Sequence, residues 1–169
     1  MKTFKKACFI GLGYIGLPTA AIVAHSGIRV LGVDINKSIV DNINQGMIHI
    51  IEPGLSDVVK TVVVSKMLRA SIVPEDSDVF LIVVPTPFTH NYQPDISYVE
   101  SATNTILPFL KPGDLYIIES TSPVGTTEKM AALIFGKRPE LKNKIYIAYC
   151  PERVLPGNVL HELVYNDRV

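Results

Sequence analysis

The chain has 169 residues, 47% of them hydrophobic, and its 16 Lys and Arg residues balance 16 Asp and Glu residues. This length and apolar content suit one globular domain and argue against extended disorder. The even balance of charge excludes a general electrostatic attraction to nucleic acid or to an anionic membrane surface. An anionic ligand would therefore have to be held by local groups.

No apolar run approaches the length of a membrane span, and the N-terminal segment MKTFKKACFIG reaches a glycine-rich turn before a signal-peptide core can develop. Cys8 and Cys150 are the only cysteines, too few for a disulfide framework, and the four histidines form no cluster with the spacing of metal ligands. We therefore expect a cytoplasmic protein with reduced thiols, no bound metal, and neither nucleic acid nor membrane as a partner.

Short β-branched runs recur along the chain with helical patterns between them. The predicted strands cover 7–11, 29–34, 78–84, 115–120 and 144–150, with a weaker sixth at 67–71, and the predicted helices cover 14–26, 37–45, 54–64, 97–109 and 126–135. Continuous apolar strands indicate a parallel sheet buried on both faces, and their alternation with helices implies right-handed crossovers. The predicted fold class is α/β: a Rossmann-type, doubly wound, mostly parallel sheet in three α/β/α layers, forming a single domain over 1–169.

The segment GNVLHELVYNDRV (157–169) is amphipathic and ends without a polar tail or a helix cap. We interpret this as a chain that continues, and expect the domain to be the N-terminal part of a longer protein.

Gly11, Gly13 and Gly16 form the pattern G-x-G-x-x-G between the first predicted strand and the first predicted helix. In a dinucleotide-binding turn the first glycine permits the tight turn, the second lets the backbone approach a pyrophosphate, and the third lets the helix pack closely on the strand. The phosphates then lie at the helix N-terminus, where N–H groups and the helix dipole favour negative charge. A glycine-rich turn without a ligand is the alternative interpretation.

Asp34 ends the second predicted strand, where a carboxylate can accept hydrogen bonds from the hydroxyls of the adenosine ribose. The same carboxylate would repel a 2′-phosphate, so the sequence predicts NAD rather than NADP as the cofactor. The alternative role of Asp34 is to cap the helix that begins near Asn36.

Three further strand ends are followed by polar loops, PTPFTHNYQPD (85–95), TSPVGTTEKM (121–130) and PERVLPG (151–157). In an open α/β sheet these loops lie beside the binding crevice. Taken singly, Thr86, Thr121 and Thr126 suit ordinary turn and cap chemistry, and Glu152 with Arg153 suits a solvated surface pair.

Together, the blocks GLGYIGLP, VVPTP, ESTSPVGTTEKM and YCPERVLPG resemble the UDP-glucose/GDP-mannose dehydrogenase family. The blocks IHIIEPGL (48–55), LRAS (68–71), PDISYVESA (94–102) and PERVLPG are most similar to the members that oxidise UDP-N-acetyl-D-mannosamine. The resemblance runs from about Lys5 to Val169 and covers only the N-terminal, NAD-binding part of that family's chain.

This resemblance implies a four-electron oxidation at C6 of a UDP-N-acetylated sugar, which reduces two NAD⁺ and gives the uronic acid for cell-envelope polysaccharide synthesis. In outline, the alcohol is oxidised to an aldehyde, a cysteine captures it, a second hydride transfer leaves a thioester, and water hydrolyses the thioester. The family's thiol, lysine and asparagine lie in motifs downstream of these 169 residues. The resemblance therefore implies a domain that binds NAD without turnover, within an enzyme that forms homo-oligomers.

The resemblance also implies roles for individual residues. The implied cofactor-binding residues are Gly11, Gly13, Tyr14, Ile15, Gly16, Asp34, Thr86 and Thr121. Thr86 matches a residue near the nicotinamide half of the cofactor, and Thr121 matches the threonine that helps to hold a catalytic water. Glu152 matches the glutamate associated with that water, and such a carboxylate can act as a general base directly or through one water.

The implied substrate-binding residues are Glu152, Arg153, Val154 and Leu155, the last three on the sugar and phosphate side of the cleft. Family members that oxidise UDP-glucose carry a second glutamate where this chain has Pro156, and the difference favours an N-acetylated sugar. Cys150 lies close to Glu152, but no cation or base in the sequence is placed to activate its thiol, so we expect it to be a small buried hydrophobe.

Two other functions remain open from the residues alone. A free-standing NAD(H)-sensing module would need the same cofactor turn, because Rossmann domains host many functions. A two-electron hydroxyacid dehydrogenase would also share the N-terminal pattern. Thr121 and Glu152 argue against the sensor, which requires neither residue.

Overall fold

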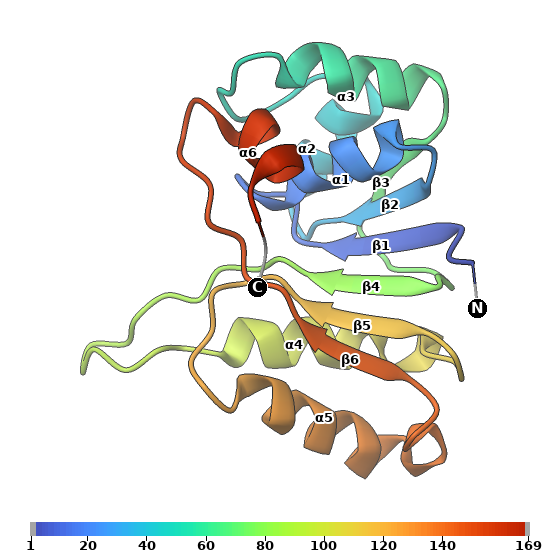
Figure 1. Ribbon diagram of the computed structural model, residues 1–169, viewed down its shortest axis with the longest axis vertical. Helices are drawn as coiled ribbons and strands as arrows, with labels where there is room; N and C mark the ends of the chain where they lie inside the picture. The colour runs from blue at the N-terminus through green and yellow to red at the C-terminus, as the bar shows by residue number, and fades with distance from the viewer. Residues whose placement is uncertain (1–2, 168–169) are drawn as a thin grey trace.

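Six parallel strands form one sheet in the order β3-β2-β1-β4-β5-β6, in a computed structural model that describes residues 3–167 (Figure 1). The strands are β1 (Lys6–Ile10), β2 (Arg29–Val33), β3 (Leu68–Ser71), β4 (Val79–Ile82), β5 (Leu115–Ile118) and β6 (Tyr146–Tyr149). The α-helices are α1 (Gly16–His25), α2 (Lys37–Asn44), α3 (Leu55–Val64), α4 (Ser97–Ile106), α5 (Thr126–Lys137) and α6 (Val159–Tyr165). Two short 3₁₀ helices, η1 (Leu107–Phe109) and η2 (Pro139–Leu141), follow α4 and α5.

This strand order is that of a doubly wound dinucleotide-binding sheet, in which the chain reverses direction across the sheet between β1 and β4. The predicted fold class is confirmed, and the weakly predicted strand at 67–71 is real as β3, which pairs with β2. The predicted helix over 97–109 ends earlier, at Ile106. Pro108 lacks the N–H that would continue an α-helix, and the chain passes into η1 instead.

Helices cover both faces of the sheet, because side chains of each central strand alternate between two apolar cores. Ala7 and Phe9 of β1 belong to the core beneath α1, α2 and α3, whereas Cys8 and Ile10 belong to the core beneath α4 and α5. Figure 1 shows the resulting three layers, with α6 beside α1 on the first of these faces. The alternation fixes the register of the strands and hence the place where each strand ends.

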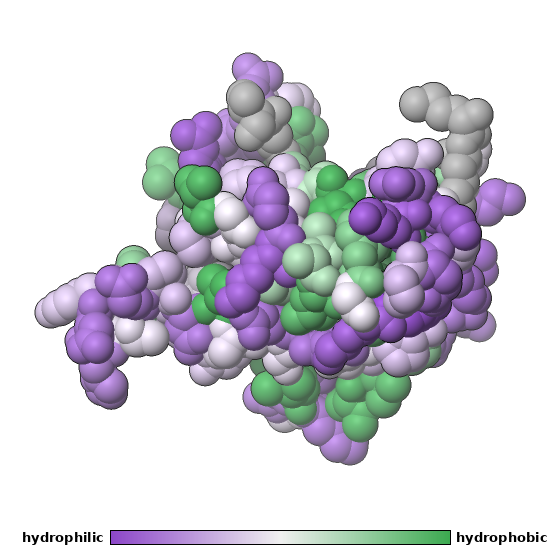
Figure 2. All heavy atoms as spheres, turned by 90° about the horizontal axis from the view of Figure 1, so that it is seen from below, coloured by the Kyte–Doolittle hydropathy of each residue, from purple (hydrophilic) through white to green (hydrophobic). Residues whose placement is uncertain are grey.

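The chain between β4 and α4 forms an arm that projects from the body of the molecule (Figure 1). A backbone bridge between Phe88 and Pro94 closes its tip. Viewed from the side of α5, the surface of the arm is largely hydrophilic (Figure 2). The arm begins where Thr86 lies, so it extends outward from the edge of the sheet at which the strands end.

The amphipathic segment predicted at the end of the chain forms α6, whose buried side chains are Val159 and Leu163. The ends of the predicted domain, residues 1–2 and 168–169, lie outside the described residues. Between residues 3 and 167, no helix has the length and apolar character needed to cross a bilayer.

Candidate cofactor-binding site

A cavity of about 550 Å³ opens at the carboxyl ends of the strands. Its lining includes the glycine-rich turn after β1, Asp34 after β2, Thr86 after β4, Thr121 after β5 and Glu152 after β6. Parallel strands end at the same edge of a sheet, so loops that lie far apart in the sequence meet there. The size of the cavity is within the range usual for cofactor sites.

The glycine-rich turn is packed so tightly that two of its glycines have no room for a side chain. Gly11 has φ of 100°, and a Cβ there would lie 2.2 Å from the carbonyl oxygen of Val83. A Cβ on Gly16, the first residue of α1, would lie 2.0 Å from the carbonyl oxygen of Gly11. The turn therefore folds back on itself and brings the start of α1 against β1 and β4, as the G-x-G-x-x-G pattern predicted.

Gly13 differs from its two neighbours, because a Cβ built on it would meet no protein atom within 4 Å. Its backbone is exposed and lines the cavity together with Tyr14 and Ile15. The space above Gly13 is thus a cradle that a side chain would fill. A pyrophosphate could reach the backbone N–H groups at the start of α1 there, where the helix dipole favours an anion.

Asp34 lines the cavity and accepts two hydrogen bonds from the backbone. Its Oδ2 accepts from the N–H of Leu12 at 3.0 Å, and its Oδ1 accepts from the N–H of Asn36 at 2.9 Å. The helix-capping role that sequence reasoning left open for Asp34 belongs to Asn36, whose side chain accepts from the N–H of Ser38 at the start of α2. Asp34 itself holds the glycine-rich turn beside the position expected for a ribose.

The loops after β4 and β5 are joined at the cavity. The hydroxyl of Thr86 donates to the carbonyl oxygen of Thr121 at 2.6 Å. The hydroxyl of Ser120 accepts from the N–H of Val84 at 2.9 Å and donates to the carbonyl oxygen of the same residue at 2.7 Å. Thr126, by contrast, forms a local hydrogen bond, in which its hydroxyl donates to the carbonyl oxygen of Pro123.

Glu152 lines the cavity and accepts the N–H of Arg153 at 2.8 Å. Arg153, Val154 and Leu155, which were predicted to line the sugar side, do not belong to the lining of this cavity, and Leu155 is 69% exposed. These three residues follow Glu152 directly on the loop after β6. Cys150 is partly buried at the end of β6, where its N–H continues the pairing with Ile118.

Sequence reasoning missed Glu119, which is 2% exposed and lines the cavity directly after β5. Its Oε1 lies 3.5 Å from the hydroxyl of Thr19 on α1. The sequence did contain a signal for Glu119, because it directly follows a strand of apolar residues. A carboxylate at such a position is expected to be buried, and a buried carboxylate indicates a structural or functional role. Ser101 and Thr105 of α4 also line the cavity, and their spacing places them on one face of that helix.

Among residues 3–167, the lining of the cavity includes three carboxylates, those of Asp34, Glu119 and Glu152, and no Lys or Arg side chain. The donors that this lining offers to the phosphates of a dinucleotide are the backbone N–H groups at the start of α1. The negative charge beside the ribose position also fits a cofactor without a 2′-phosphate.

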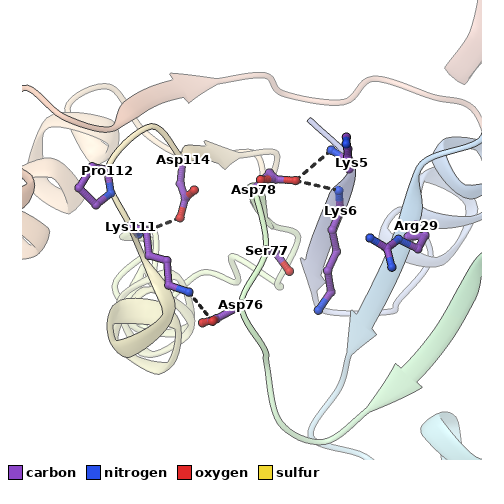
Figure 3. A pocket seen from close by; sticks show the side chains of 9 residues that line it. All are labelled: Lys5, Lys6, Arg29, Asp76, Ser77, Asp78, Lys111, Pro112 and Asp114. Carbon is purple, nitrogen blue, oxygen red and sulfur yellow. Dashed lines mark hydrogen bonds and ion pairs between the residues drawn. The ribbon is translucent and has the colours of Figure 1, made fainter. Parts of the chain in front are cut away.

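A second hollow, of about 380 Å³, lies at the opposite edge of the sheet, where the strands begin (Figure 3). Several of its polar groups bond to one another. Asp78 accepts the N–H groups of Lys5 and Lys6 at 2.9 and 3.1 Å, and Lys111 forms an ion pair with Asp76. We assign no ligand to this hollow, because these contacts join the starts of β1, β4 and β5 to one another.

Comparison with known proteins agrees with this geometry. The family model for the UDP-glucose/GDP-mannose dehydrogenase family, NAD binding domain, matches residues 5–169. The chain is 54% identical to the UDP-N-acetyl-D-mannosamine dehydrogenase of Campylobacter jejuni, over 100% of this chain and 44% of that protein. It is 52% identical to the NDP-N-acetyl-D-galactosaminuronic acid dehydrogenase of Ralstonia nicotianae, over 98% of this chain and 41% of that protein.

Among solved structures, the native UDP-N-acetyl-mannosamine dehydrogenase Cap5O from Staphylococcus aureus superposes with a TM-score of 0.88 at 45% identity. The match covers 96% of this chain and 40% of that one. The chain thus spans less than half the length of the relatives that it matches. Because the family model covers nearly the whole chain, this protein belongs to the UDP-glucose/GDP-mannose dehydrogenase family and carries its NAD-binding domain.

Proposed function

We propose that this chain is the cofactor-binding half of an enzyme that oxidises the C6 alcohol of a UDP-N-acetylated hexosamine to the carboxylic acid. One observation carries the proposal: Thr121 and Glu152 line the same cavity as the glycine-rich turn and Asp34. A domain that only senses NAD(H) would need the turn and the acid but neither of the other two residues.

The overall reaction converts the alcohol and one water to the acid, with two NAD⁺ reduced to two NADH and two protons released. NAD supplies the hydride acceptor for both oxidations. The chain's own contribution is to bind and orient: the start of α1 holds the pyrophosphate, and Asp34 accepts the ribose hydroxyls. The thiol that holds the sugar between the two oxidations would come from a motif outside these 169 residues.

Glu152 and Thr121 are proposed to act on the water that hydrolyses the thioester. The hydroxyl of Thr121 would orient the water, and the carboxylate of Glu152 would accept its proton as the oxygen attacks the acyl carbon. The main chain at Thr121 is fixed by the hydrogen bond from Thr86, so the loops after β4 and β5 present their groups together. Arg153, Val154 and Leu155 follow on the same loop and are proposed to contact the sugar nucleotide.

UDP-N-acetyl-D-mannosamine is the proposed substrate. The curated relatives from Campylobacter jejuni and from Escherichia coli, at 54% and 55% identity, are named for that sugar. The relative named for N-acetyl-D-galactosaminuronic acid, at 52% identity, makes the galacto sugar the competing substrate. A cytoplasmic location, a homo-oligomeric enzyme and a role in cell-envelope polysaccharide synthesis stay predictions from the sequence.

The first test of this proposal is calorimetric titration of the protein with NAD⁺ and with NADP⁺. We expect saturable binding of NAD⁺ and little binding of NADP⁺. Equal affinity for the two nucleotides would contradict the role given to Asp34, and binding of neither would contradict the cofactor assignment itself.

The second test measures NADH released per sugar by a chain that also includes the remaining length found in the relatives. We expect two NADH per UDP-N-acetyl-D-mannosamine, and a lower rate with the galacto and gluco sugars. One NADH per substrate would indicate a two-electron dehydrogenase instead. NAD⁺ binding without any sugar oxidation would favour an NAD(H) sensor.

A further inference from the structure

Glu52 lies in the connection between α2 and α3, which does not follow a strand, and yet the residue is only 6% exposed. The block IHIIEPGL that contains it contributed to the family resemblance without suggesting a role for any of its residues. A buried carboxylate costs free energy unless hydrogen bonds compensate for its lost hydration, so its partners show what it does.

The three hydrogen-bond donors to Glu52 come from distant parts of the chain. Its Oε2 accepts the hydroxyl of Tyr14 at 2.7 Å and the N–H of Gly157 at 3.0 Å. Its Oε1 accepts the N–H of Val159 at 2.7 Å. Tyr14 lies inside the glycine-rich turn and lines the cofactor cavity, whereas Gly157 ends the loop that carries Glu152 and Val159 begins α6.

The backbone around Glu52 is itself fixed. Gly54 has φ of 75° and precedes α3, and the N–H of Leu55 donates to the carbonyl oxygen of Glu52 at 3.2 Å. A side-chain carbon of Leu160 on α6 lies 3.5 Å from where a Cβ on Gly54 would be. The turn that carries Glu52 is therefore packed against α6, so a fixed backbone presents the carboxylate to its partners.

Burial alone would raise the pKa of Glu52, but the hydrogen bonds from Tyr14, Gly157 and Val159 outweigh it, and the pKa lies below its ordinary value. The same contact with Glu52 raises the pKa of Tyr14. At neutral pH Glu52 is thus an ionised acceptor that faces three donors. A glutamine would place an NH₂ group against at least one of those donors.

The loop from 151 to 157 is anchored at both ends. At its start, the N–H of Cys150 donates to the carbonyl oxygen of Ile118 at 2.9 Å. At its end, the N–H of Gly157 is held by Glu52. A second carboxylate, that of Glu162 on α6, accepts the N–H of Leu155 at 2.8 Å, and its other oxygen accepts from the side chain of Asn158, so its contacts stay within the loop and α6. Glu52 is the anchor that also touches the cofactor side.

We infer that Glu52 is a positioning residue that couples the cofactor turn to the loop carrying Glu152, through the oxygen that Tyr14 and Gly157 share. The inference rests on the proposed function, in which both segments serve one reaction. Cofactor on the turn fixes Tyr14, a fixed Tyr14 holds Glu52, and Glu52 holds the end of the loop. Such coupling is reciprocal, so a loop in place also favours cofactor on the turn.

Hydrogen exchange of the loop amides from 152 to 159, with and without saturating NAD⁺, tests this coupling. In the wild-type protein we expect NAD⁺ to slow exchange in the loop by about tenfold, within the usual range for coupled sites. Tyr14→Phe removes only the hydroxyl, so the loop should exchange as in the wild type without NAD⁺ and lose the slowing with it. In Glu52→Gln, the loop amides should exchange faster without NAD⁺, and NAD⁺ should no longer slow their exchange.

Glu162→Gln is the matched control, because it loosens the loop without touching Tyr14. In this variant the loop amides should exchange faster without NAD⁺, and NAD⁺ should still slow their exchange. Full slowing in Tyr14→Phe, with NAD⁺ still bound, would overturn the coupling and leave the proposed function intact. Absence of NAD⁺ binding by the wild-type protein would overturn both. Tyr14→Phe removes one oxygen from a half-buried side chain, so it keeps the test decisive even if Glu52→Gln fails to fold.

Discussion

The backbone N–H of Leu12 donates to Oδ2 of Asp34 across 3.0 Å, so the acid that ends β2 holds the glycine-rich turn that follows β1. The proposed ribose ligand therefore has a structural contact before any cofactor arrives. A variant without the Asp34 side chain loses both the support of the turn and the proposed contact with the ribose. A variant that keeps one side-chain oxygen separates these two effects.

Asp34→Ala should weaken NAD⁺ binding by about tenfold to a hundredfold, because a hydrogen bond to a charged group and the support of the turn are both lost. Asp34→Asn keeps an acceptor for Leu12 but places its NH₂ beside the N–H of Asn36, so we expect a small loss of stability, weaker NAD⁺ binding and a reduced bias against NADP⁺. Calorimetry with both nucleotides measures these effects. An Asp34→Asn protein with wild-type affinity and bias would show that the charge plays no part in cofactor choice.

Gly13→Ala and Gly16→Ala should separate cofactor binding from folding. A methyl group on Gly13 meets no protein atom within 4 Å, so the fold should keep its stability while the space proposed for pyrophosphate is filled and NAD⁺ binding is lost. A methyl group on Gly16 would lie 2.0 Å from the Gly11 carbonyl oxygen and should destabilise the domain by about 1–3 kcal/mol.

Urea unfolding and NAD⁺ titration of both glycine variants supply the measurement. Undiminished NAD⁺ binding by Gly13→Ala would mean that the pyrophosphate lies elsewhere. A fully stable Gly16→Ala would mean that the turn can open to accept the methyl group.

Glu152→Gln and Thr121→Ala should slow thioester hydrolysis, in a chain that includes the remaining length found in the relatives. We expect kcat to fall by about a hundredfold or more for Glu152→Gln, the usual contribution of a general base. NADH should then appear in a rapid burst followed by a slow steady phase, because the oxidations precede the impaired step. NAD⁺ affinity should change by less than about twofold for Glu152→Gln, since a base acting on water adds little to cofactor binding. Slow NADH formation without a burst would instead place Glu152 in the oxidation steps.

Tyr116 and Thr103 form a buried hydroxyl pair at 2.7 Å, and Thr103 also donates to the carbonyl oxygen of Val99. Tyr116→Phe removes one donor and leaves the threonine bonded, so it should cost about 1 kcal/mol of unfolding free energy. Thr103→Val leaves the tyrosine hydroxyl buried without its partner and should cost more, about 1–3 kcal/mol. Chemical denaturation of both variants and the double variant checks this order. Equal costs that add fully would contradict the coupling of the pair.

The two cysteines should differ in reactivity. Burial raises the pKa of the Cys8 thiol to about 12, and the residue is fully covered in β1. A raised pKa keeps the thiol protonated through neutral and mildly alkaline pH, and the thiolate is the reactive form. Iodoacetamide at pH 8 should therefore modify the partly exposed Cys150 and leave Cys8 unmodified until urea unfolds the domain. Mass spectrometry distinguishes the two sites, and early labelling of Cys8 would mean that β1 opens locally.

Much of the fold and of the cofactor turn followed from the sequence, because the signals involved are local. Apolar runs bounded by polar loops gave the strands, and helical periodicity gave the helices, with ends that differ only by a few residues from the structure. The spacing of Gly11, Gly13 and Gly16 predicted a turn whose packing indeed excludes two of the three possible side chains. Each of these features depends on residues that are neighbours in the chain.

Only the tertiary structure decided which distant groups meet. Tyr14 and Gly157 reach Glu52 from positions 38 and 105 residues away, and no periodicity or spacing relates the three. In the same way, Glu119 reaches the cavity because the parallel strands end together, while Arg153 to Leu155 do not line it. Hydrogen bonds between remote segments depend on how the helices pack on the sheet, and that packing follows from the whole core rather than from any one stretch of sequence.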